Sequence, residues 1–426
     1  MRILVISHNV FSMTGNMGKT LISYFKDFGK ENLAQFYIHS EVPTSDICIN
    51  YYRVTDKEMI KSVFGFKAGK ALNESDIDKN RKTSRTDSGA EARIYQKGRK
   101  RTPLIYIMRN LWWRLGHWNN KSFKKWVDDF NPDCVFFSSG DYAFMYDIAL
   151  KTAESRNIPL YISCMDDYYL NNKNSSKLLG DFQHRHFMKS VNRAMRYSSA
   201  IFCICDGMSR DYEKLFNKKC VTLHTAASFD GRLEGEKKRK ISYIGNLGYN
   251  RHLQLVSIGR ALKKSGEDIE HIDVYSSEKR DEILKFMTPE NGIIFHGSIS
   301  ADEVKHVMAE SLAVIHTESF DEDIKNTVRY SVSTKIADSL MSGTCILAYG
   351  PADVSSIKYL SDNNAAYCIT SKEKLSSGLS ELLTNEDIRN TIVKNALELA
   401  RSNHFPGIAG KLIKEVIESA GSQFCS

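Results

Sequence analysis

The sequence contains no apolar run of about 18 residues, the shortest stretch expected to cross a membrane as a helix. Its nine cysteines form no CxxC pair and no Cys/His cluster at zinc spacing. An odd number of cysteines scattered through apolar segments argues against a disulfide framework and a structural metal, so we expect a cytoplasmic protein. The N-terminal apolar run is too short for a signal peptide, and we predict that residues 2–7 form a first β-strand.

The apolar residues that are present suffice for two cores. The chain has 426 residues, 42% of them hydrophobic, which exceeds one ordinary domain. Short apolar runs alternate with helical patterns on both sides of a hydrophilic stretch at 228–240, as in parallel sheets with crossover helices. We therefore predict an α/β protein with two Rossmann-like, doubly wound domains facing across a cleft. The predicted parts are residues 1–228 with an insertion near 55–126, residues 229–400, and a helix over 401–426 that returns toward the first domain.

Positive charge and tryptophan are concentrated in one segment. Residues 81–126 contain thirteen Lys or Arg and two acids, a net charge of +11, so the other 380 residues together carry −3. All four tryptophans lie there: Trp112, Trp113, Trp118 and Trp126. The segment either packs on the core or binds anionic lipid, and nucleic acid is a third alternative that no recognition motif supports. We predict peripheral binding to the inner face of the plasma membrane near Arg99–Trp126, helped by Lys97, Arg99, Lys100 and Arg101.

Two segments of the second half indicate chemistry, and the first is SYIGNLGYNR (242–251). It is a strand followed by two glycines and a cation. Gly245 and Asn246 stand at the strand end, where a glycine lets backbone amides approach a phosphate, and Arg251 supplies a forked, charge-assisted contact. The alternative is an ordinary strand–turn–helix with a solvated Arg251.

The second segment is RYSVSTKIADSLMSG (329–343), followed by a strand. Its polar residues Ser331, Ser333 and Thr334 mark a helix start and Gly343 its end. The amides of that helix start, its positive dipole and Lys335 together suit a diphosphate. Asp338 lies one turn further in, where it can accept hydrogen bonds from a ribose. The alternative is a capped amphipathic helix with its apolar residues turned inward.

These motifs, with Gly297 between them, resemble glycosyltransferase family 4, and more closely its bacterial capsule and O-antigen enzymes. The resemblance is clear over 240–400 and weaker before it. It implies the GT-B fold, an N-terminal acceptor domain and a C-terminal donor domain. It also implies transfer of a sugar from a nucleoside-diphosphate sugar, which we expect to be UDP-linked, to a saccharide hydroxyl with retention of configuration. The implied donor residues are Gly245 and Arg251 as a diphosphate clamp, Lys335 on phosphate, Asp338 on ribose, and His296 with Gly297 at the base. The family also has a glutamate eight residues before its ribose-binding acid. This chain has Tyr330 at that position, so the role of that glutamate is vacant or is filled by another residue.

The first half contributes weaker candidates. In the loop GNMGKT (15–20), Gly15 and Gly18 are expected to close over the donor phosphates or the acceptor; a P-loop is the alternative, but Met13 stands where that motif requires glycine. Asp166 and Asp167 follow the strand LYISC, at an edge where open α/β sheets bind ligands, and we expect them to face the acceptor. Their alternative is a surface turn.

No metal or other cofactor is expected. Asp76–Asp78 and Asp321–Asp323 match a metal-binding DxD pattern but look like solvated loops, and the twelve histidines show no pair at metal spacing. We expect Arg251 and Lys335 to stabilise the leaving diphosphate instead. The product is expected to be a surface polysaccharide and the acceptor a lipid-linked saccharide. A sugar-nucleotide epimerase and a non-catalytic nucleotide-sugar-binding module remain as alternatives.

Overall fold

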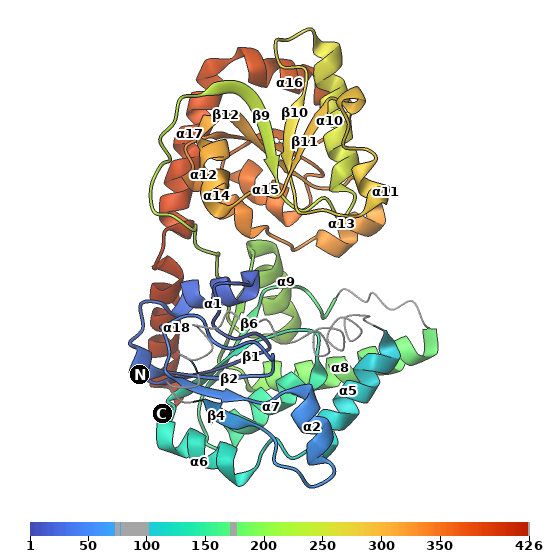
Figure 1. Ribbon diagram of the computed structural model, residues 1–426. Coiled ribbons are helices and arrows are strands. Elements are labelled where there is room, and N and C mark those ends of the chain that lie inside the picture. The colour runs from blue at the N-terminus through green and yellow to red at the C-terminus, as the bar shows by residue number, and fades with distance from the viewer. Residues whose placement is uncertain (73–76, 78–101, 171–176, 425–426) are drawn as a thin grey trace. The chain divides into compact units, whose positions relative to one another are not determined.

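The computed structural model describes residues 1–72, 77, 102–170 and 177–424. It divides into two compact units: unit 1 is Met1–Leu223 with Ala409–Ser426, and unit 2 is His224–Ile408. Each unit contains a mainly parallel sheet with helices packed against it (Figure 1). The predicted α/β fold is therefore confirmed. The units divide after residues 223 and 408, where the sequence predicted boundaries at 228 and 400.

Unit 1 is built on an eight-stranded sheet with the order β4-β3-β2-β1-β5-β6-β7-β8. Only β4, at the edge, runs antiparallel to its neighbour among the strands described. The strands are β1 (Ile3–Ser7), β2 (Leu33–Tyr37), β3 (Asn50–Arg53), β4 (Lys70–Leu72), β5 (Cys134–Ser138), β6 (Leu160–Cys164), β7 (Ala200–Cys203) and β8 (Cys220–Thr222). Among the residues described, the α-helices of this unit are α1 (Asn16–Phe25), α2 (Asp56–Ser62), α5 (Pro103–Leu115), α6 (Lys121–Phe130), α7 (Ala143–Glu154), α8 (Lys177–Tyr197), α9 (Asp206–Phe216) and α18 (Ile408–Phe424).

Unit 2 is built on a six-stranded parallel sheet with the order β11-β10-β9-β12-β13-β14. The strands are β9 (Lys238–Ile244), β10 (Ile272–Tyr275), β11 (Ile293–Gly297), β12 (Ser311–Thr317), β13 (Cys345–Tyr349) and β14 (Tyr367–Ile369). The helices are α10 (Arg251–Ser265), α11 (Asp281–Leu284), α12 (Ala301–Glu310), α13 (Glu322–Val328), α14 (Thr334–Met341), α15 (Ser355–Asp362), α16 (Leu375–Thr384) and α17 (Glu386–Leu399), with a π-helical turn at Ala400–His404.

The central strands are buried because helices cover both faces of each sheet. Every residue of β1, β2, β5 and β6 is buried, which explains why these segments are almost entirely apolar, with Gln35 as a buried polar residue in β2. Helix α18 belongs to the core of unit 1, where Ile413 and Ile417 pack with strand residues. Tyr161 on β6 donates a hydrogen bond to the carbonyl of Ile417 over 3.3 Å.

The insertion predicted near 55–126 contains regular elements in its described part. Helix α2 starts at a capping box formed by Thr55 and Glu58, and strand β4 follows it. Helices α5 and α6 are separate because α5 ends at Gly116.

The predicted membrane segment is only partly described. Trp113 and Trp118 lie in the core, 2% and 9% exposed, so these indoles do not reach a membrane surface. Lys97, Arg99, Lys100 and Arg101 lie outside the described residues, as do Asp76 and Asp78. Within the part of the chain that the structure describes, no helix has the length and apolar character needed to span a bilayer.

Candidate active site

A pocket lies in unit 2 where its strand order reverses. From β9 the sheet continues through β10 to β11 on one side. On the other side of β9 lies β12, followed by β13 and β14. Crossover helices therefore diverge from this point and leave a crevice at the carboxyl ends of β9 and β12, the usual ligand position in open α/β sheets. It is lined by Gly245 and by the polar residues Asn246, Arg251, His316, Ser333 and Lys335, among others.

The amino end of α14 forms one wall of this pocket. Ser333 is the N-cap and accepts a hydrogen bond from the amide of Lys335 over 3.3 Å. The opposite face of the helix is apolar and buried through Ile336, Leu340 and Met341, so packing fixes the direction in which the helix start points. The positive end of the helix dipole meets the pocket there, an arrangement suited to an anion.

Lys335 extends the positive charge of the helix start. Burial lowers the pKa of its amino group, Arg251 lowers it further, and Asp338 opposes both. A bound phosphate would offset these effects, because an anion favours the charged form of the lysine. Ser331 and Thr334 flank the helix start, with Thr334 exposed.

Arg251 begins α10 and is held by an acid that the sequence did not predict. Its Nε and Nη2 atoms donate to the two carboxylate oxygens of Glu318 over 3.1 and 2.8 Å, and Nε also reaches the carbonyl of Thr317 at 3.3 Å. Glu318 is 1% exposed. Burial raises the pKa of its carboxyl, and Arg251 opposes that shift. The forked ion pair therefore fixes the guanidinium, and no described residue accepts from Nη1.

His316 is the second pocket residue that sequence reasoning missed. It is the penultimate residue of β12, and its Nε2 lies 2.9 Å from the hydroxyl of Ser356. Burial lowers its pKa to about 3, with Arg251 as the next cause, so the ring is neutral. The signal in the sequence was the polar run HTES directly after the apolar LAVI, which places His316 and Glu318 at the carboxyl end of a buried strand.

Gly245 and Asn246 close the pocket at the end of β9. The amide of Gly245 donates to the carbonyl of Tyr275 over 3.0 Å, and a Cβ added at this position would lie 2.7 Å from the hydroxyl of Tyr243. A side chain at this position would therefore have to displace the buried ring of Tyr243. The side-chain oxygen of Asn246 accepts from the amide of Gly248 over 2.6 Å, which shapes the turn before α10.

Asp338 and His296 have partners of their own. An oxygen of Asp338 accepts from the amide of Ser228 over 2.6 Å, and burial raises the pKa of this carboxyl. His296 lies on the edge strand β11, where its Nε2 is 2.5 Å from Asp273 and its ring stacks on Tyr275 at 4.6 Å. Gly297 follows with φ +76. Their predicted contacts with ribose and base stay predictions.

The unit 1 candidates mostly serve local structure. Gly15 is the N-cap of α1, and a Cβ at Gly18 would meet the Ser12 carbonyl at 2.5 Å. Asp167 accepts from the amides of Tyr169 and Leu170 over 3.1 and 2.9 Å and from the hydroxyl of Tyr212 over 2.8 Å, which matches the surface-turn alternative. Asp166 is exposed and accepts from Tyr168 over 3.1 Å. Asp321 of the DxD pattern caps α13.

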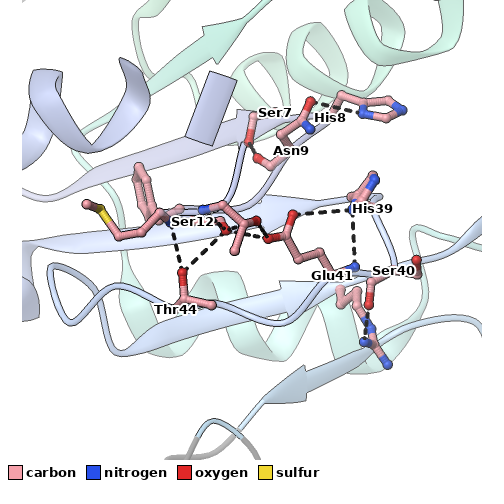
Figure 2. A network of polar contacts seen from close by, with 12 residues as sticks. Ser7, His8, Asn9, Ser12, His39, Ser40, Glu41 and Thr44 are labelled. Atoms are coloured by element: carbon pink, nitrogen blue, oxygen red, sulfur yellow. Dashed lines mark hydrogen bonds and ion pairs between the residues drawn. The ribbon is translucent and has the colours of Figure 1, made fainter. Parts of the chain in front are cut away.

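A polar network surrounds the loop after β1 (Figure 2). The hydroxyls of Ser12 and Thr14 donate to the carboxylate of Glu41, and the amide of Met13 donates to the hydroxyl of Thr44 over 2.8 Å. The amide of Glu41 donates to Nδ1 of His39 over 3.1 Å. These contacts tie the loop before α1 to the segment after β2, at the carboxyl ends of two adjacent strands.

His8 lies beside this network, directly after β1. Strand order reverses between β1 and β5 in this unit, so His8 occupies the position that ligands favour. Its Nδ1 is 3.2 Å from the amide oxygen of Asn9, which can only accept, so Nδ1 carries the proton and Nε2 is an acceptor. Its ring stacks on Tyr142 at 5.9 Å, and the Arg109 guanidinium lies 3.9 Å from the centre of that tyrosine ring. Burial lowers the pKa of His8 to about 3.

Comparison with known proteins supports the assignment of this chain to a class. Residues 208–407 match a family described as glycosyl transferase-like. HepE of Anabaena, solved with UDP, is 12% identical, covers 98% of this chain and 100% of its own, and has a TM-score of 0.61. A trehalose-6-phosphate structure from E. coli with UDP-2-fluoro glucose is 9% identical, covers 98% of this chain and 99% of its own, and has a TM-score of 0.62. WaaG, a glycosyltransferase of lipopolysaccharide biosynthesis, is 10% identical, covers 97% of this chain and 99% of its own, and has a TM-score of 0.52. Comparison with curated proteins by sequence gives no match.

The structural likenesses show the fold, which is GT-B, and the family match covers the unit that contains the pocket. Residues 208–407 are therefore glycosyl transferase-like, and the chain has the fold of that class of enzyme. Among the residues described, no group of three or more His, Cys, Asp or Glu side chains is placed to hold a metal ion.

Proposed function

We propose that the enzyme transfers a sugar from a nucleoside-diphosphate sugar to a hydroxyl group of a saccharide. The observation that carries this proposal is the convergence of Arg251, Lys335 and the start of α14 on one pocket at the strand switch of unit 2. The donor is proposed to be UDP-linked, supported by the likeness to HepE solved with UDP and to the E. coli structure solved with UDP-2-fluoro glucose.

The chemical task of this pocket is to stabilise a diphosphate as it leaves the sugar. Negative charge develops on the leaving oxygen while the sugar becomes oxocarbenium-like, and groups fixed in advance stabilise that charge most effectively. Lys335 and the start of α14 are proposed to fill this role, supported by their place at the pocket, and Glu318 holds Arg251 so that its Nη1 stays available. We propose that Glu318 is the acid of this pocket, where family resemblance had pointed to position 330. Transfer is proposed to retain the anomeric configuration.

The acceptor is proposed to bind unit 1 at the carboxyl ends of its central strands. His8, His39 and Glu41 supply imidazole and carboxylate hydrogen-bonding groups there, a combination suited to sugar hydroxyls. Asp166 remains a candidate at the same edge of the sheet. We propose a lipid-linked saccharide of surface polysaccharide synthesis as the acceptor, consistent with the described role of WaaG.

A panel of nucleotide sugars, offered with and without saccharide acceptors, tests this function. We expect nucleoside diphosphate to be released and a new glycosidic bond to form, with the anomeric configuration of the donor kept. Conversion of the donor to its epimer without an acceptor would favour the epimerase. Donor binding without turnover under any acceptor would favour the binding module, and either result contradicts the proposal.

Activity is expected to survive exhaustive treatment with EDTA. The physical reason is that Lys335, Arg251 and helix amides provide the positive charge that a divalent ion provides in metal-dependent transferases. Transfer should be measured after chelation and again after Mg²⁺ or Mn²⁺ is added. Activity that disappears on chelation and returns with metal would show that the metal-free mechanism is wrong.

A further inference from the structure

Helix α5 of unit 1 is apolar on two opposite faces. Tyr106 and Trp113 on one face are buried. On the other face Leu104, Met108, Leu111 and Leu115 are 47–57% exposed. Their spacing of four, three and four residues forms one stripe along the helix, turned away from the buried face. A surface helix normally carries polar residues on such a stripe, so this exposed apolar face marks an interaction surface.

The turn after α2 continues this surface. Helix α2 packs against α5 (Figure 1), and the amide of His117 donates to the hydroxyl of Ser62 over 3.1 Å, which joins the ends of the two helices. In the turn that follows α2, the side chains of Phe64 and Phe66 are 72% and 66% exposed, more than any other large apolar side chain described. Gly65 between them has φ +87.

The exposure of these phenylalanines is fixed by the backbone. The amides of Phe64 and Phe66 both donate to the carbonyl of Lys61, over 3.0 and 3.4 Å. The amide of Gly65 donates to the carbonyl of Ser62 over 3.1 Å. The positive φ of Gly65 makes this reversal possible at little cost. The two aromatic rings therefore project from an ordered turn.

The charges around this surface are positive. Lys61 and Lys67 flank the two phenylalanines and Arg114 precedes Leu115; none of the three cations forms an ion pair with a described residue. The acids of α2 are occupied within unit 1. Asp56 accepts from Arg109 over 3.0 Å and from Trp113 over 2.7 Å, and Glu58 closes the capping box on Thr55.

We propose that the face formed by Ile60, Phe64, Phe66 and the α5 stripe binds the surface of a bilayer containing anionic lipid. Apolar side chains that enter the headgroup region, next to cations that meet the lipid charges, are the combination that such a surface recognises. A symmetric dimer through this face is disfavoured, because it would bring unpaired cations of both copies together without an acid to neutralise them. The membrane contact thus differs from the tryptophan patch expected from the sequence and does not depend on the donor site.

Co-sedimentation of the full chain with vesicles tests the proposal. The chain is expected to bind phosphatidylcholine vesicles that contain phosphatidylglycerol. Binding should be much weaker without phosphatidylglycerol and should fall as the salt concentration is raised. Replacing Phe64 and Phe66 together by Ser should lower the partition coefficient by at least about tenfold, since two large apolar side chains lose their burial. Lys61→Gln and Lys67→Gln should each lower it about fivefold.

The matched control is Leu215→Ser, which removes a leucine on α9 that is 45% exposed and lies outside the proposed face. It should bind vesicles as the unchanged chain does. Equal binding by the double Phe variant, with its melting temperature unchanged, would overturn the proposal. Failure of the unchanged chain to bind anionic vesicles would also overturn it, and self-association that the double Phe variant abolishes would then identify a second copy as the occupant. Donor hydrolysis by the double Phe variant should be unaffected, which separates this test from that of the proposed function.

Discussion

Replacing Lys335 by Ala is expected to weaken donor binding by about 10- to 150-fold. The proposed role of Lys335 is a charged hydrogen bond to the donor diphosphate, and loss of such a bond costs about 1.5–3 kcal/mol. The phosphate is present in the bound donor and in the transition state, so kcat/KM should fall at least as much as affinity does. Isothermal titration with nucleoside diphosphate and a steady-state transfer assay measure the two quantities.

Two controls separate this effect from loss of structure. Lys358→Ala removes a lysine of α15 in the same unit that pairs with Asp362, and it should leave donor affinity unchanged. Lys335→Arg retains the charge and should recover part of the affinity. If folded Lys335→Ala protein binds and turns over donor as well as the unchanged enzyme, Lys335 does not contact the diphosphate.

Replacing Arg251 by Ala is expected to lower both stability and donor binding. Glu318 is buried, and removing one partner of a buried ion pair leaves an uncompensated charge that costs about 3–5 kcal/mol at neutral pH. Burial already raises the pKa of Glu318 and Arg251 opposes it, so the pKa should rise further in the variant. The folded variant then holds a proton that the unfolded chain releases.

The pH dependence follows from that raised pKa. The stability deficit of Arg251→Ala relative to the unchanged enzyme should shrink as pH falls toward the ordinary carboxyl range, because protonated Glu318 no longer needs a partner, and it should reach its full size as pH rises through the raised pKa. Calorimetric melting at several pH values measures it. A deficit that does not change with pH would show that Glu318 is not the cause.

A double variant distinguishes stability from function at this pair. Arg251→Met with Glu318→Leu removes both charges at similar volume, and such replacements of buried pairs are often neutral or stabilising. The melting temperature should return near its original value while donor binding stays weak, because the proposed phosphate contact is still missing. Recovery of donor binding along with stability would mean that Arg251 has only a structural role.

The sequence predicted the fold well because the fold depends on strong, local patterns. Strands such as β1 and β13 are buried on both faces, so they appear as uninterrupted apolar runs, and helix α14 is framed by Ser333 and Gly343. The elements inside the predicted insertion were harder to anticipate, because α2 and β4 are short and because aromatic residues continue across the break at Gly116 between α5 and α6.

The site was only partly predictable, since distant pairings are not visible in one sequence. Spacing within a segment brought out Gly245, Arg251 and Lys335, and the structure places all three on one pocket. Glu318 is 67 residues from Arg251, and nothing in the local pattern shows that the two side chains meet. His8 was overlooked for a similar reason, because its stacking partner Tyr142 comes from the loop after another strand.

The most direct test of the account is a crystal structure of the enzyme with a bound nucleoside diphosphate. We predict that the diphosphate lies in the unit 2 pocket, within about 2.7–3.2 Å of Lys335 Nζ, an Arg251 nitrogen and an amide at the start of α14. Glu318 should still hold Arg251 in that complex. A diphosphate bound instead at the glycine loop before α1, or in the unit 2 pocket without contact to either Lys335 or Arg251, would contradict the account.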